Sequence, residues 1–264
     1  MSGVTAGGRP RSGILGPMST VGPLRRRIRY GIAMSVAWVA IRVLFRVRVE
    51  GQSGWPTRPA VICFNHQSWV DPFVLMATLP WRPRLSFFGP KEEDMSRGGR
   101  NRLMMWTGTA VPFKPGKSDL KEAARTVERV LSAGGVLAIA GEGRIHVGEG
   151  ELLELNEGAA FFAIRSGVPL VPVAINGTSW LAFGRRLRVR VGEPIETSGR
   201  PTRVAVDELT TRAWEALHQL VSGYPDPVPP PFGSRWYRLT EVFNDWPEGE
   251  RPVSPPSSGL PDDR

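Results

Sequence analysis

Apolar and polar positions follow two periods along this chain, and the two periods alternate. Short apolar runs bounded by polar, glycine or proline residues predict seven strands, at Arg46–Val49, Ala60–Phe64, Leu85–Phe88, Thr109–Phe113, Val136–Ala140, Leu170–Asn176 and Leu187–Val191. Between them, apolar residues recur every three or four positions, which predicts helices over Ser118–Ala133, Gly158–Arg165 and Thr202–Val221. Such alternation is typical of α/β folds, so we expect a mixed, largely parallel sheet sandwiched by helices.

The amino-terminal segment fits neither pattern. Residues Tyr30–Phe45 are apolar apart from Arg42, and arginines precede and follow them. The uninterrupted apolar part is shorter than the roughly 20 residues that a spanning helix needs. An apolar helix flanked by arginines, over residues 24–48, is typical of a segment that lies in a membrane surface. The alternative is a buried core helix whose arginines lie at its solvent-exposed ends.

Composition divides the chain into four parts. Residues 1–23 are rich in glycine, serine and proline, and we expect them to be a disordered basic terminus. The predicted membrane-associating helix occupies 24–48, and the strands and helices of one domain fill 49–224. From residue 225 to 264 prolines dominate, which predicts a tail that does not pack fully.

The charge is unevenly distributed. The net charge is +9, yet nine of the 34 lysine and arginine residues precede the first acidic residue, Glu50, which leaves 25 basic and 25 acidic residues in the rest. A neutral body disfavours a nucleic-acid partner, and the arginines beside the apolar amino-terminal helix favour an anionic membrane surface. The single cysteine, Cys63, excludes an internal disulfide and indicates a reducing, cytosol-facing location. The three histidines form no metal-binding motif, so we expect neither a metal nor a resident cofactor.

The candidate chemistry begins at FNHQSWVDP, residues 64–72, where a predicted strand ends. Ligands of open α/β sheets bind at the carboxyl ends of strands, which favours a catalytic couple of His66 and Asp71. Two structural alternatives stay open. Asp71 is the N-cap of a helix with Pro72 at its first position, or Ser68 is the N-cap and Asp71 reaches back as in a capping box.

Four blocks in order resemble the glycerolipid acyltransferases, the lysophosphatidic acid acyltransferase-like family. They are NHQSWVD at 65–71, GTAVPFKPGKSD at 108–119, GEGRIHVGEGEL at 141–152 and VPLVPVAI at 168–175. The resemblance covers residues 60–180. It implies transfer of a fatty acyl group from acyl-CoA or acyl carrier protein to the hydroxyl of a lysophospholipid acceptor, by default lysophosphatidic acid, giving phosphatidic acid. The enzyme would work on the cytoplasmic face of a membrane.

The resemblance also implies roles for individual residues. His66 would be the general base and Asp71 would orient its ring. Substrate-binding positions would be Asn65, Ser68, Gly108, Lys114, Glu142, Gly143 and Arg144. The chain departs from the family where phosphate is expected, because Pro115 replaces the arginine of the second block and Asn156 replaces a later lysine. These departures concern the acceptor and leave the couple intact.

Two other functions fit the same couple. One is a thioesterase or lipase-type hydrolase, in which water or Ser68 attacks; the absence of a GxSxG turn from the sequence argues against it. The other is a non-catalytic lipid-binding protein, and an intact His66–Asp71 couple argues against that.

Overall fold

The computed structural model describes residues 23–90, 104–113, 117–146 and 148–224. Of the terminus predicted to be disordered, 1–23, residues 1–22 lie outside the described residues, whereas Pro23 is helical. The predicted tail at 225–264 and Lys114 also lie outside the described residues.

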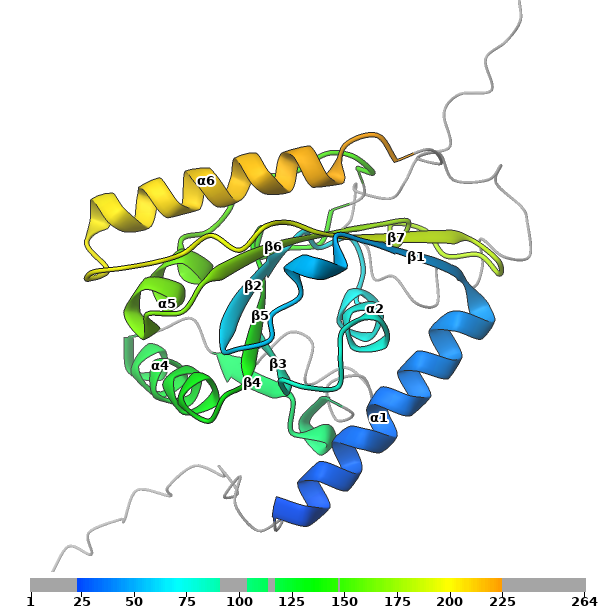
Figure 1. The fold of residues 1–264 in the computed structure, drawn as a ribbon, viewed down its shortest axis with the longest axis horizontal. Helices are drawn as coiled ribbons and strands as arrows, with labels where there is room; N and C mark the ends of the chain where they lie inside the picture. Colours follow the sequence, from blue (N-terminus) through cyan, green and yellow to red (C-terminus); the bar gives the residue numbers. More distant parts are fainter. Residues whose placement is uncertain (1–22, 91–103, 114–116, 147, 225–264) are drawn as a thin grey trace, which may run out of the picture.

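A seven-stranded sheet forms the centre of the fold (Figure 1). All seven predicted strands are present, as β1 (Arg46–Glu50), β2 (Ala60–Phe64), β3 (Leu85–Pro90), β4 (Ala110–Phe113), β5 (Val136–Ala140), β6 (Leu170–Asn176) and β7 (Arg186–Val191). Their order is β1-β7-β6-β2-β5-β3-β4, and every neighbouring pair is parallel except β6–β7. The expected mixed, largely parallel sheet is confirmed.

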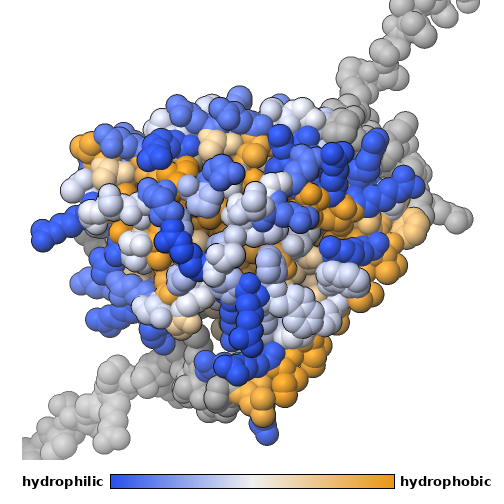
Figure 2. All heavy atoms as spheres, in the orientation of Figure 1, coloured by the Kyte–Doolittle hydropathy of each residue, from blue (hydrophilic) through white to orange (hydrophobic). Residues whose placement is uncertain are grey.

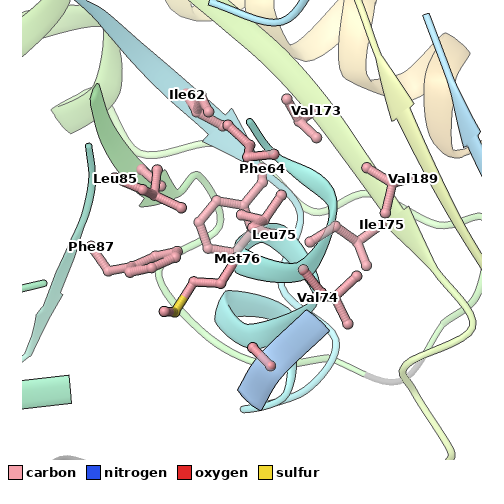
Figure 3. Close-up of a cluster of buried hydrophobic side chains, with 14 of the residues drawn as sticks. Ile62, Phe64, Val74, Leu75, Met76, Leu85, Phe87, Val173, Ile175 and Val189 are labelled. Atoms are coloured by element: carbon pink, nitrogen blue, oxygen red, sulfur yellow. The ribbon is translucent and has the colours of Figure 1, made fainter. Parts of the chain in front are cut away.

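Alternate residues of each central strand point to opposite faces, and helices cover both. In β2, Ala60, Ile62 and Phe64 join one hydrophobic core, whereas Val61 and Cys63 join the other. Figure 3 shows the first core, in which Leu75 and Met76 of a helix lie against Phe64. Because both faces are covered, the central strands read as continuous apolar runs rather than as alternating ones.

The helices divide into two layers (Figure 1). One face carries α1 (Pro23–Leu44) and α2 (Asp71–Thr78), and the other carries α4 (Lys117–Ser132), α5 (Gly158–Ser166) and α6 (Arg203–Val221). Sequence signals explain the ends of two of them. The Thr202 side chain caps α6 by accepting from the Ala205 N–H, and Gly167 ends α5 with a positive φ.

Helix α1 is apolar on two sides. Tyr30, Met34, Ala37 and Ile41 face α2 and the sheet as part of the core, so the buried-helix interpretation holds for this side. The helix ends at Leu44 rather than at residue 48, because Arg46–Glu50 pair with β7. Arg42, the charge within the apolar run, donates to the Ala77 carbonyl at the end of α2 (2.7 Å) and lies over the Trp38 ring.

Within the described ranges, we find no helix that is both long enough and apolar enough to cross a bilayer. The membrane association expected for the amino-terminal helix therefore stays a prediction.

Candidate active site

The loops that follow β2, β5 and β6 meet at one edge of the sheet. Phe64, the last residue of β2, lies beside Ala140 of β5 and Val173 of β6 in the parallel register. The carboxyl ends of these adjacent strands therefore lie together, as strand ends do at ligand sites of α/β sheets. Asn65 joins two of them, since its carboxamide donates to the Ile175 carbonyl (2.8 Å) and accepts from the Ile175 N–H (2.7 Å).

The Asp71 carboxylate accepts four hydrogen bonds at this edge of the sheet. Its Oδ2 accepts from the His66 ring Nδ1 (2.9 Å) and from the N–H groups of Gln67 (2.8 Å) and Ser68 (2.9 Å). Its Oδ1 accepts from the Thr178 hydroxyl (2.6 Å). The carboxylate is fully buried, and these four donors compensate for its lost hydration.

The two local alternatives for this turn are settled in part. Helix α2 begins at Asp71 itself, so Asp71 is not its N-cap. Asp71 does reach back to the Ser68 N–H, which is one half of a capping box. The Ser68 hydroxyl accepts from the Val70 N–H at 3.3 Å instead of bonding the third residue of a helix. The turn is irregular, and this irregularity lets residues five apart meet.

The orientation of His66 leaves one ring nitrogen for chemistry. Nδ1 faces Asp71, and the ring packs edge-on against Phe64 with centroids 5.9 Å apart. Because a carboxylate is an acceptor, this contact places the ring proton on Nδ1 and a lone pair on Nε2. In the part of the chain that the structure describes, Nε2 has no hydrogen-bond partner, and the side chain is 19% exposed. A group of this kind can accept a proton from a bound hydroxyl.

Glu142 lies beneath His66 and holds its backbone. One carboxylate oxygen accepts from the His66 N–H (2.7 Å) and the other from the Leu153 N–H (3.0 Å). Its neighbour Gly143 has φ 69, and a Cβ there would collide with the Asn156 side chain. Both residues shape the turn after β5. Arg144, the next residue, is exposed.

A second histidine occupies the same edge. His146 is buried, and its Nε2 lies 2.7 Å from Glu142 Oε1, close enough for an ion pair although outside hydrogen-bond geometry. Its Nδ1 accepts from the Gly148 N–H at 3.3 Å, and its own N–H donates to the His66 carbonyl at 3.1 Å. Burial lowers the pKa of His146, but the facing Glu142, together with the charges of Glu151 and Asp71, outweighs burial and leaves that pKa raised.

The predicted substrate-binding residues divide by position. Asn65, Ser68, Glu142 and Gly143 lie around His66, where the contacts found for them are with the protein's own backbone and side chains. Gly108 precedes β4, so it lies toward the amino ends of the parallel strands, at the edge opposite His66. Its carbonyl accepts from Arg84. The substrate-binding roles of all these residues stay predictions.

Sequence reasoning missed Thr178, Glu149 and Arg185. Thr178 lies two residues after the end of β6 in the stretch Asn-Gly-Thr-Ser, so a strand end and a turn-forming Asn-Gly pair were the available signals. Glu149 and Arg185 form a fully buried ion pair at 3.2 Å, and no spacing in the sequence relates them. No cluster of metal-ligating side chains occurs among residues that the structure describes.

Two comparisons with known proteins agree with this architecture. Residues 46–176 match the family model described as Acyltransferase. The chain is also similar to the crystal structure of PlsC, the 1-acyl-sn-glycerophosphate (LPA) acyltransferase from Thermotoga maritima. That likeness has a TM-score of 0.57 and 18% identity, and it covers 75% of this chain and 82% of the other. At this identity the second comparison shows a shared fold.

Proposed function

The chain belongs to the acyltransferase family, and we propose that this O-acyltransferase moves a fatty acyl group from an acyl thioester to the hydroxyl of a lysophospholipid. The resemblance that four sequence blocks indicated is confirmed by the family match. Lysophosphatidic acid is the proposed acceptor, with phosphatidic acid as the product. Acyl-CoA and acyl carrier protein are the two proposed donors.

The orientation of His66 carries this proposal. Its Nδ1 is held by Asp71 at 2.9 Å, and its Nε2 faces away from that carboxylate on a partly exposed ring. Nε2 would remove the proton of the acceptor hydroxyl while the oxygen attacks the thioester carbonyl. The tetrahedral intermediate would then expel the thiolate, which takes up that proton from the imidazolium. Asp71 would stabilise the imidazolium between these two steps.

Direct transfer to the acceptor requires no nucleophile from the protein. Ser68, the nucleophile of the hydrolase alternative, is fully buried, and its hydroxyl accepts from the Val70 N–H. A residue placed this way supports the turn. This burial favours the acyltransferase over a serine hydrolase that uses the same histidine.

The test of the proposed function separates transfer from hydrolysis. The full chain is incubated with one acyl thioester and a panel of lysolipids, and thiol release, acylated product and free fatty acid are measured together. We expect thiol release that depends on the lysolipid and is matched by acylated product. Thiol release matched by free fatty acid, without acylated lipid, would overturn the proposal in favour of the hydrolase.

A variant pair assigns the activity to His66. His66→Ala should lower turnover by roughly 10²–10⁴-fold, the usual contribution of a general base. His218→Ala is the matched control, because His218 is an exposed residue of α6 that stacks on Trp214. Its turnover should equal that of the unmodified chain. Retained activity in His66→Ala with an unchanged melting temperature would remove His66 from the mechanism.

We also propose that the outer side of α1 rests on an anionic membrane surface, at the cytoplasmic face. This side exposes Leu24, Ile28, Ile32, Val36, Val39 and Val43. Figure 2 shows the corresponding band of hydrophobic atoms along the lower right of the molecule, where α1 runs in Figure 1. A helix that is apolar on its outer as well as its inner side favours a second apolar environment.

Tryptophans and arginines border the same side. Trp38 and Trp81 line an open hollow of about 380 Å³, and Trp106 lies under the Arg29 guanidinium at 5.3 Å. Indoles and arginines are the side chains that favour the headgroup level of a bilayer. This combination supports a helix that lies in the interface, with lipid substrates arriving from the same surface.

The membrane proposal is tested without removing α1, because its inner side belongs to the core. Val36→Glu, at a position 62% exposed, should reduce flotation with anionic vesicles severalfold and leave the melting temperature unchanged. Val204→Glu is the control, since Val204 is 66% exposed but lies on α6 in the opposite helical layer. Equal flotation of all three proteins would contradict the proposal.

A further inference from the structure

The turn that follows β6 reaches the proposed catalytic couple at the Asp71 oxygen that His66 does not contact. We propose that Thr178 is a positioning residue of the acyl-transfer site, and that the buried Glu149–Arg185 pair holds it in place. This inference deepens the function proposed above and rests on it. Thr178 touches no substrate in this assignment; it acts through Asp71.

The division of donors on Asp71 singles out Thr178. Three donors from residues 66–68 converge on Oδ2, and Thr178 donates to Oδ1 at 2.6 Å. Thr178 is 0% exposed, and 107 positions separate it from Asp71 in the sequence. Among the residues that the structure describes, Thr178 is the side chain that donates a hydrogen bond to Asp71 Oδ1. Without it, this oxygen would be a buried acceptor with no partner.

A donor on Oδ1 has two consequences for His66. The terminal torsion of an aspartate is soft, so an anchor on Oδ1 fixes the plane in which Oδ2 faces the ring. A hydrogen bond to the charged form also draws charge from the carboxylate. Removing the hydroxyl should therefore strengthen the pull of Asp71 on the imidazolium proton and loosen the orientation of the ring.

The turn itself is held from both sides by charged groups. Glu149 accepts from the Gly177 N–H (2.9 Å), and Arg185 donates from Nε to the Gly177 carbonyl (2.6 Å). Gly177 has φ 94, and a Cβ there would collide with the Arg186 carbonyl, so glycine is required. Both charged side chains are 0% exposed. A buried ion pair whose oxygens and N–H groups bind one turn fixes that turn firmly.

The neighbouring residue supplies a matched control. Ser179 lies in the same turn and is also buried, but its hydroxyl donates to Glu149 (2.6 Å). Thr178→Val and Ser179→Ala each delete one buried hydroxyl from this turn, and only the first deletion removes a hydrogen bond to Asp71. Thr178→Ser restores the hydroxyl at the original position.

The experiment measures turnover of the full chain across pH, with melting temperatures alongside. We expect Thr178→Val to lower kcat roughly ten- to a hundredfold, as a lost hydrogen bond to a charged group does. The acidic limb of its pH profile should move to higher pH. Thr178→Ser and Ser179→Ala should stay within about threefold of the unmodified chain, with unmoved profiles. If valine prevents folding, Thr178→Ala takes its place with the same expectations.

Two results would overturn the inference. One is a Thr178→Val enzyme with unchanged kcat and pH profile; the other is equal losses in Thr178→Val and Ser179→Ala with unmoved profiles, which is the signature of a structural turn. A readout independent of turnover uses the ¹⁵N shifts of the three imidazoles. The ¹⁵N shift of His66 Nδ1 should change in Thr178→Val and stay the same in Ser179→Ala. If this shift occurs in a chain that transfers no acyl group, the proposed function fails while the positioning role stands.

Discussion

Two histidine–carboxylate pairs lie at the same edge of the sheet, and they differ in what remains open. His66 meets Asp71 through Nδ1 at 2.9 Å, and His146 meets Glu142 through Nε2 at 2.7 Å. The His66 ring is partly exposed and has its Nε2 outside these contacts, whereas the His146 side chain is 7% exposed and its Nδ1 accepts from Gly148. A short distance to a carboxylate does not distinguish the two pairs. They differ in whether the ring nitrogen that does not face the carboxylate is already bonded.

The two carboxylates differ in the same way. Asp71 gathers donors around the ring of His66, so its charge acts on the imidazole. Glu142 bonds the backbone N–H groups of His66 and Leu153, so it holds two segments of chain. The comparison therefore supports the proposal that the first pair takes part in the chemistry, whereas the second pair holds the architecture of the turn. Changes to the two pairs should have opposite signatures.

The largest expected loss of turnover follows from removing the charge of Asp71, and removing the charge of Glu142 is its counterpart. Three donors face Asp71 Oδ2, so the oxygen of an asparagine would occupy that place and its amino group would face Thr178, which keeps the His66 geometry. Asp71→Asn should lower kcat on the order of 10³-fold or more, as loss of the imidazolium's partner does in a serine protease triad. Turnover assays and thermal melts measure it.

Glu142→Gln is the counterpart of that variant. Both oxygens of Glu142 face N–H groups, so the amino group of glutamine must meet a donor. A buried donor left without a partner costs about 1–3 kcal/mol. We expect a lower melting temperature and a smaller loss of turnover per folded molecule. Two results would contradict the distinction between the pairs. One is a Glu142→Gln variant with an unchanged melting temperature and a thousandfold loss of turnover; the other is an Asp71→Asn variant that remains active.

The same comparison explains how far the sequence could predict this site. His66 and Asp71 could be predicted because they lie only five positions apart, directly after a predicted strand. The strands could be predicted because they are continuous apolar runs. Thr178 was not predicted, because its contact depends on where β6 lies in the sheet order. Matching blocks by their order also cannot show which edge a residue occupies. Gly108 was grouped with His66 on that basis, yet it precedes a parallel strand and lies toward the other edge.

A smaller effect concerns His146 and the pH dependence of stability. Glu142, Glu151 and Asp71 are the charged groups that face it, and the pKa of His146 is raised in the folded chain. A raised folded pKa adds stability that is fully present below the unfolded pKa and is lost as pH rises through the folded pKa. His146→Gln cannot ionise, so the unmodified chain should exceed it in stability at pH 5.5 by more than at pH 8.5.

Urea unfolding at the two pH values measures this difference, with His218→Gln as the control for an exposed histidine. Turnover of His146→Gln should fall by less than about tenfold, because in the proposed mechanism no proton of the reaction passes through this ring. A stability difference that grows with pH would contradict the assignment. A turnover loss as large as that of Asp71→Asn would place His146 in the chemistry.

The smallest expected effect concerns Cys63, a thiol three residues before His66. It is 1% exposed, and burial, followed by the nearby charge of Glu142, raises its pKa to about 12. A thiol with that pKa is scarcely ionised near neutral pH, and the thiolate is the reactive form. Iodoacetamide should therefore leave the folded chain unmodified by intact mass and fully active, while the urea-unfolded chain gains one adduct. Loss of activity together with an adduct on Cys63 in the folded chain would show that the thiol is accessible and reactive. The protein would then have an accessible nucleophile of its own, and a covalent acyl-enzyme would compete with direct transfer between two substrates as the mechanism.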